Sequence, residues 1–191
     1  ETAGSYEVTS TSPTWELSGV GFYKNIWGGY FPRQVRAISI GDGRSDAKSR
    51  LYFSGNDDSY SGRGIGIYEF TYGGATWNGI VVTTTPVSVA SVAVGDVYGD
   101  GRSRVYGGRS DGFLVEGSWT GATWSISNTS TNQGASLTAL TMGKWPSEAT
   151  TRLFLGSAAG AVLQFTWSGS TWTSMSISSE TSAVNALWFG D

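Results

Sequence analysis

The 191-residue chain contains no cysteine, no histidine and few charges. Without cysteine there are no disulfides and no thiol chemistry, and without histidine the commonest general base and zinc ligand are missing. Charged residues make up 14% and the net charge is -3, so no basic nucleic-acid-binding surface is predicted. The sequence has no run of about 18 apolar residues, so no membrane span is predicted. Any catalysis would therefore depend on carboxylates, Lys, Tyr or Ser.

Glycine and aromatic residues are abundant, with 28 Gly, 9 Trp and 9 Tyr, and they accompany many Ser and Thr. This composition suits short exposed strands joined by tight turns. A repeat is visible where four similar segments end in tryptophan: TSPTW, GGATW, TGATW and SGSTW, ending at Trp15, Trp77, Trp124 and Trp172. The last three are 47 and 48 residues apart, and the first gap is 62 because that unit carries extra residues.

Each unit contains four predicted strands, and its blocks align along the chain. The first strand is the block at 35–42, 89–96, 137–144 and 184–191; the second is at 51–53, 105–107 and 153–155. The third is at 5–10, 67–72, 114–119 and 163–167, and the fourth follows each tryptophan. One position of the first strand carries only small residues, each followed by a larger apolar one: Ala37-Ile38, Ser91-Val92, Ala139-Leu140 and Ala186-Leu187.

Four antiparallel strands in 40 to 50 residues are typical of one blade of a β-propeller. We therefore predict an all-β single domain, a β-propeller of about four blade equivalents, with units at 1–34, 35–87, 88–134, 135–182 and 183–191. The small residues would line the hub and the larger ones would pack between blades. A β-sandwich is the alternative, but it does not predict fourfold self-similarity.

The repeats resemble those of lectin-like β-propellers. The GATW and GSTW ends resemble the tail of the Asp-box turn of sialidase-type propellers, although the aspartate of that box is absent here. The stretch from Gly95 to Gly101 resembles the calcium loop of integrin-type FG-GAP repeats, but it has only Asp96 and Asp100 where that family has three or more Asp or Asn. The resemblance covers nearly the whole chain at the level of the blade pattern and implies an architecture more than an activity.

The predicted ring is incomplete. The last first-type strand and the two opening strands belong to one ring-closing blade, which lacks its second strand. Unpaired strand edges attract other strands, so we expect one of three situations. A partner or another copy of the chain completes the blade, or the chain is a fragment of a larger propeller, or the edge is otherwise covered.

Two long connections are predicted to emerge at the same end of one blade. The connection after Trp15 is about eight residues longer than its equivalents and is rich in aromatics, and the loop after the strand at 51–53 is rich in Asn, Asp and Arg. Aromatic faces stack on sugars and polar groups bond their hydroxyls. The candidate ligand residues are Tyr23, Trp27, Tyr30, Phe31, Asn56, Asp57, Asp58, Tyr60 and Arg63. The alternative, which we favour slightly, is that the aromatics fill a gap between blades or a subunit contact.

Acidic loops follow the first strand at the other end of each blade. Asp42, Asp46, Asp96 and Asp100 are candidate calcium ligands, because hard oxygen ligands suit that ion. We favour the alternative of Asp-stabilised turns paired with Arg50 and Arg104. A column of Glu7, Glu69, Glu116 and Gln164 is interpreted as strand residues, not paired catalytic carboxylates, and the repeated tryptophans as packing elements.

The sequence thus predicts a non-enzymatic, extracellular or cell-surface recognition module, secreted by composition alone, that binds a glycan or another cell-surface ligand. The main alternative is a self-assembling structural subunit of a fibre or surface layer, joined through the incomplete blade as a homo-oligomer. A carboxylate-dependent hydrolase is the weakest interpretation, because no local motif supports it. No cofactor is predicted apart from the candidate calcium.

Overall fold

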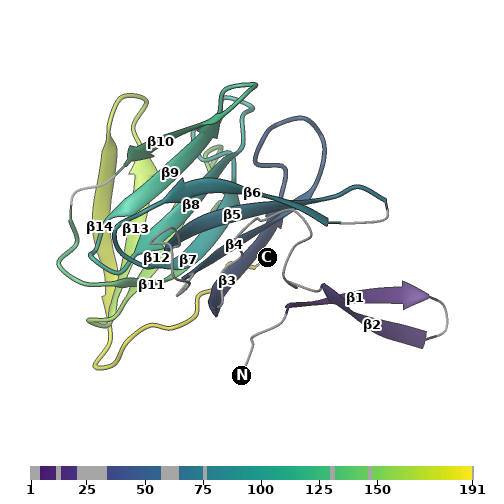
Figure 1. The fold of residues 1–191 in the computed structure, drawn as a ribbon. Coiled ribbons are helices and arrows are strands. Elements are labelled where there is room, and N and C mark those ends of the chain that lie inside the picture. Colours follow the sequence, from purple (N-terminus) through teal and green to yellow (C-terminus); the bar gives the residue numbers. More distant parts are fainter. Residues whose placement is uncertain are drawn as a thin grey trace.

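The computed structural model describes residues 5–11, 14–20, 34–56, 65–74, 77–129, 132–145 and 148–190. All regular structure in these residues is β-strand, and none of it is helical, so no helix there could cross a membrane. The strands form one two-stranded and three four-stranded antiparallel sheets (Figure 1). This confirms an all-β chain built from repeated four-stranded units.

Each four-stranded sheet is a simple meander whose strand order follows the chain. The first sheet contains β3 (Gln34–Gly41), β4 (Arg50–Asn56), β5 (Ile65–Tyr72) and β6 (Trp77–Thr84). The second contains β7 (Val89–Gly95), β8 (Arg104–Arg109), β9 (Leu114–Trp119) and β10 (Trp124–Asn128). The third contains β11 (Leu137–Gly143), β12 (Arg152–Ser157), β13 (Ala161–Trp167) and β14 (Trp172–Ser179). That all units form a single domain stays a prediction.

The position of a strand in its sheet explains its sequence. The second strands β8 and β12 are buried along almost their whole length and read as apolar or glycine runs, as strands covered on both faces do. The fourth strands β10 and β14 are exposed and rich in Ser and Thr. The sequence of a strand therefore indicates whether that strand is buried in the packed interior or exposed at the edge of its sheet.

The core lies between consecutive sheets. One buried cluster joins Tyr52, Ile67 and Val82 of the first sheet to Val89, Val92, Val105 and Val115 of the second. A second cluster joins Val97, Tyr106 and Leu114 of the second sheet to Leu137, Leu153, Leu155, Leu163 and Phe165 of the third. The three sheets therefore pack face to face in chain order and hold one another together by shared apolar burial.

The first strands of successive sheets approach each other at glycines. A Cβ placed on Gly41 would lie 2.9 Å from Val94 Cγ1, and one on Gly95 would lie 2.8 Å from Met142 Sδ. Both glycines are the seventh residue of their block, and both neighbours are the sixth residue of the next block. The two junctions between sheets therefore have the same register.

The segment at 184–190 continues this series, although it is not a strand. Gly143 faces the ring of Phe189 in the way that Gly41 faces Val94. Val184 N donates to Ser157 O at 3.0 Å, and Thr138 Oγ1 donates to Val184 O at 2.5 Å. The prediction of a strand at 184–191 is wrong for the described residues 184–190, because a strand needs a ladder partner and none of the described strands pairs with this segment.

The predicted opening strands are present as β1 (Ser5–Thr11) and β2 (Thr14–Val20), paired antiparallel. They form a two-stranded sheet of their own and stand apart in Figure 1. The described residues contain no ring-closing blade that joins this hairpin to the segment at 184–190. Ile38 differs from its counterpart Val92: Val92 is buried in the cluster between the first and second four-stranded sheets, whereas Ile38 is exposed and so does not pack between sheets.

Candidate functional site

The two predicted ligand loops are attached at one end of the first sheet. Gln34 at the start of β3 is the register partner of Asn56 at the end of β4, and Asn56 is the partner of Ile65 at the start of β5. The connections at 21–33 and 57–64 are therefore attached to three adjacent strands in one row. Asn56 is the one candidate ligand residue on a described strand; Tyr23, Trp27, Tyr30, Phe31, Asp57, Asp58, Tyr60 and Arg63 lie outside the described residues.

The predicted calcium carboxylates are already engaged in turns. Asp42 accepts hydrogen bonds from the backbone N–H groups of Asp46 and Ala47, at 3.0 and 2.6 Å. Asp96 accepts from the N–H groups of Gly99 and Gly101, both at 2.8 Å. The two loops thus close in the same way, as Asp-containing turns commonly do.

The second aspartate of each loop pairs with the arginine that opens the next strand. Asp46 accepts two hydrogen bonds from Arg50, at 2.7 and 2.6 Å, and Asp100 accepts two from Arg104, at 3.0 and 2.6 Å. The guanidinium groups lower the carboxyl pKa in both pairs: that of Asp46 falls well below its usual range and that of Asp100 falls to about 2. In the third unit, Glu148 pairs with Arg152.

These partners favour the turn interpretation over a metal site. The described residues contain no group of three or more Asp or Glu gathered to hold a metal ion. A calcium ion at Asp46 or Asp100 would have to compete with a bidentate arginine for the same oxygens. Calcium binding here stays a prediction.

Two members of the glutamate column, Glu69 and Glu116, link a loop to its sheet. Glu69 is buried, and it accepts hydrogen bonds from Arg44 Nε at 2.9 Å and Tyr52 Oη at 3.1 Å. Glu116 is buried in the second sheet and accepts from Tyr98 Oη at 2.6 Å and Ser118 Oγ at 3.0 Å. A buried carboxylate is stable only with such partners. These residues lie on strands, as the sequence predicts, but their role in anchoring the loops has no local sequence signal.

The same loops reach across to the next sheet. The guanidinium of Arg44 lies 3.9 Å from the centre of the Trp119 ring, a cation–π distance, and Tyr98, at the same loop position, lies 4.6 Å from the Trp167 ring. Tyr98 Oη also accepts a hydrogen bond from Trp172 Nε1 at 3.2 Å. This contact was not predicted from the sequence, where its one signal is the shared offset of Arg44 and Tyr98 from the Gly-Asp pair that precedes them.

The repeated tryptophans pack in pairs and between sheets. Trp119 and Trp124 are register partners at one hairpin, and Trp167 and Trp172 are partners at another, with ring centres 5.4 and 5.7 Å apart. The edge of Trp124 also meets Tyr52 of the preceding sheet at 6.2 Å, and Trp172 meets Tyr106 at the same distance.

One difference between the two junctions follows from the loop residue. Tyr98 offers an oxygen to the indole N–H of Trp172, whereas the side chain of Arg44 has no acceptor atom. Trp124 Nε1 is buried and has no hydrogen-bond partner within the described part of the chain. The junction between the first and second sheets therefore has the cation–π contact of Arg44 with Trp119, where the next junction also has the hydrogen bond from Trp172 to Tyr98.

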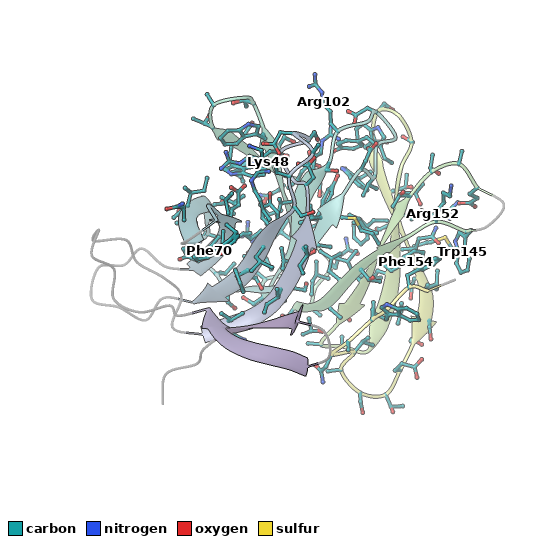
Figure 2. The ribbon with its side chains drawn as sticks, turned by 90° about the vertical axis from the view of Figure 1, so that its right-hand side faces the viewer. Lys48, Phe70, Arg102, Trp145, Arg152 and Phe154 are labelled. Carbon is teal, nitrogen blue, oxygen red and sulfur yellow. The ribbon has the colours of Figure 1, made fainter. Side chains whose placement is uncertain are left out.

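At the far end of the array, an aromatic cluster covers the third sheet. Phe189 stacks on Phe154 with ring centres 5.2 Å apart, and Trp145 meets both rings edge-on at 5.9 and 5.5 Å. Figure 2 shows Trp145 beside Phe154 on the side of the molecule opposite Phe70 of the first sheet.

The sequence matches no known protein-family model and no curated protein.

Proposed function

We propose that this chain is part of a β-propeller and acts as a non-enzymatic recognition module outside the cell that binds glycans through the connections at 21–33 and 57–64. The propeller proposal is supported by the repeated register between first strands, in which Gly41, Gly95 and Gly143 each face the sixth residue of the next block. The same register at successive junctions fits a radial arrangement of blades.

The observation that carries the binding proposal is the row of Gln34, Asn56 and Ile65 across three neighbouring strands. It brings an aromatic-rich and an Asn/Asp/Arg-rich connection to the same end of one sheet. Aromatic faces with polar groups beside them suit a sugar, which has an apolar ring face and hydroxyls at its edge. The sheet supplies a rigid base for loops of this kind.

A glycan array with the purified chain tests the proposal, in parallel with Trp27→Ala and Tyr72→Ala. Tyr72 is an exposed aromatic on the same sheet, at the end that faces away from the row of Gln34, Asn56 and Ile65, and serves as the matched control. We expect binding to a defined set of glycans that Trp27→Ala removes and Tyr72→Ala preserves. Silence across the array, or equal loss in both variants, would reject glycan binding by these loops.

A further inference from the structure

The open side of the first sheet carries a strip of exposed isoleucines. Ile38 and Ile40 on β3 are 52% and 68% exposed. Ile38 is the register partner of Phe53, and Phe53 is the partner of Tyr68, so these side chains share one face of the sheet. Phe53 and Tyr68 are nevertheless buried. The exposed isoleucine strip on β3 is therefore one strand wide, and the buried Phe53 and Tyr68 separate it from the exposed Val81 on β6.

The other end of the array carries one large exposed side chain. In the segment at 184–190, Leu187 and Phe189 are half-buried on the side of the third sheet, whereas Trp188 between them is 86% exposed. An alternation of this kind places Trp188 on the opposite side of the segment, together with Gly190. This side has no neighbouring sheet in the described part of the chain.

The junctions between consecutive sheets show which positions of one block face which positions of the next. At each junction, the seventh residue of one block faces the sixth residue of the next, and side-chain alternation puts the fifth residue on the same side as the seventh and the fourth on the same side as the sixth. The seventh residues Gly41, Gly95 and Gly143 meet Val94, Met142 and Phe189. Trp188 and Gly190 are the fifth and seventh residues of the last block, and Ile38 and Ile40 are the fourth and sixth of the first. The two uncovered surfaces are therefore the two halves of one more junction.

We propose that a second copy of this chain docks head to tail, with its Ile38 and Ile40 against Trp188 and Gly190 of the first copy. The occupant is a second copy because both surfaces remain exposed in one chain, so its own two ends do not cover each other. The segment at 184–190 also matches the single-strand width of the open strip on β3. This inference does not depend on glycan binding.

The docked junction differs from the internal ones in width. The fifth residues of the earlier blocks are the small Ser39, Ala93 and Thr141, whereas the last block has Trp188. The indole of Trp188 already covers Gly190 within one chain, so the docked segments are held further apart than at a junction with an open glycine. The contact joins two different surfaces, so it is heterologous and produces a closed ring or an open filament according to the rotation between copies.

Sedimentation velocity over a dilution series of the 191-residue chain tests the proposal, with Ile40→Asp, Trp188→Asp and Ile80→Asp as variants. We expect the wild type to form concentration-dependent oligomers and Ile40→Asp and Trp188→Asp to be monomers. Ile80 is 41% exposed on β6 and belongs to neither surface, so its replacement should leave the oligomers unchanged. Trp188 is nearly fully exposed in one chain, so Trp188→Asp removes little packing within it, and its circular dichroism should match the wild type.

Mixing the two monomeric variants gives the sharper result. Ile40→Asp keeps an intact Trp188 surface and Trp188→Asp keeps an intact isoleucine surface, so the mixture should form one-to-one dimers and nothing larger. A wild type that is monomeric at every concentration would overturn the proposal, whether or not its ends close on each other. A Trp188→Asp variant that oligomerises like the wild type, or a mixture that stays monomeric, would overturn it as well.

Discussion

Replacement of Tyr98 by phenylalanine removes one hydroxyl that joins two sheets. Tyr98 Oη donates to Glu116 Oε2 at 2.6 Å and accepts from Trp172 Nε1 at 3.2 Å. Burial, together with the hydrogen bond to Glu116, raises the pKa of Tyr98 above its usual range, so the hydroxyl stays protonated and remains a donor to the carboxylate. The phenylalanine ring keeps the contacts with Trp167 and loses only the two hydrogen bonds.

The expected loss of stability follows from these two bonds. A hydrogen bond to a charged group contributes about 1.5–3 kcal/mol and a neutral one about 1 kcal/mol. Glu116 keeps its bond from Ser118 Oγ, and the two losses share one group, so they do not add fully. We expect the free energy of unfolding to fall by about 2–3 kcal/mol. At about 2–4 °C per kcal/mol for a chain of this size, the melting temperature falls by about 4–12 °C.

Urea unfolding followed by tryptophan fluorescence and far-ultraviolet circular dichroism measures the change, and coincident transitions justify a single free energy. Tyr72→Phe is the matched control, because Tyr72 is exposed and its hydroxyl donates to Gly74 O. That variant should stay within about 0.5 kcal/mol of the wild type. If Tyr98→Phe were as stable as Tyr72→Phe, the argument that this hydroxyl joins the sheets would be refuted.

Three further outcomes are expected. Gly108→Ala should lower the free energy of unfolding by about 1–3 kcal/mol, because its Cβ would lie 2.7 Å from Leu137 O and overlap Ser91 Oγ. Ser54→Ala, at the same repeat position of the first sheet, should not destabilise the chain, because Ser54 Oγ is buried and has no hydrogen-bond partner among the described residues. If urea unfolding showed Gly108→Ala to be as stable as the wild type, this would contradict the close junction. Melting curves with EDTA and with added calcium should coincide, because Asp42, Asp46, Asp96 and Asp100 already have partners. A melting temperature that rises with calcium in the wild type but not in Asp100→Asn would support the metal site.

Most strands could be predicted from the sequence because their signals are local. Alternating apolar residues, glycine turns and the recurring tryptophans placed a strand at 114–119, where β9 lies, and one at 67–72, inside β5 at 65–72. The hairpin turns follow from residue type as well: Gly121 and Gly169 adopt positive φ in equivalent turns, which glycine adopts without strain. The segment at 184–190 has the same local pattern but no ladder partner, so pattern alone predicted a strand wrongly.

Contacts between sheets could not be predicted in the same way. Arg44 and Tyr98 occupy one loop position but reach the next sheet by different forces. Arg44 meets Trp119 by cation–π attraction, whereas Tyr98 packs on the Trp167 ring and accepts a hydrogen bond from Trp172. Their partners lie tens of residues away, and nothing near them in the sequence specifies the pairing. The candidate calcium loops show the same limit, because a pattern of aspartates does not reveal that Arg50 and Arg104 are close enough to bind them.

The sequence by itself determined the repeat, the strands and the turns of this protein, because residue type sets backbone preference and side-chain alternation within a few neighbours. Only the tertiary structure decided which faces are covered. Ile40 and Val94 hold the same place in their blocks, yet one is exposed and the other packs against Gly41. Burial depends on what lies opposite a residue, and here that is whether another four-stranded sheet packs against this face of its own sheet.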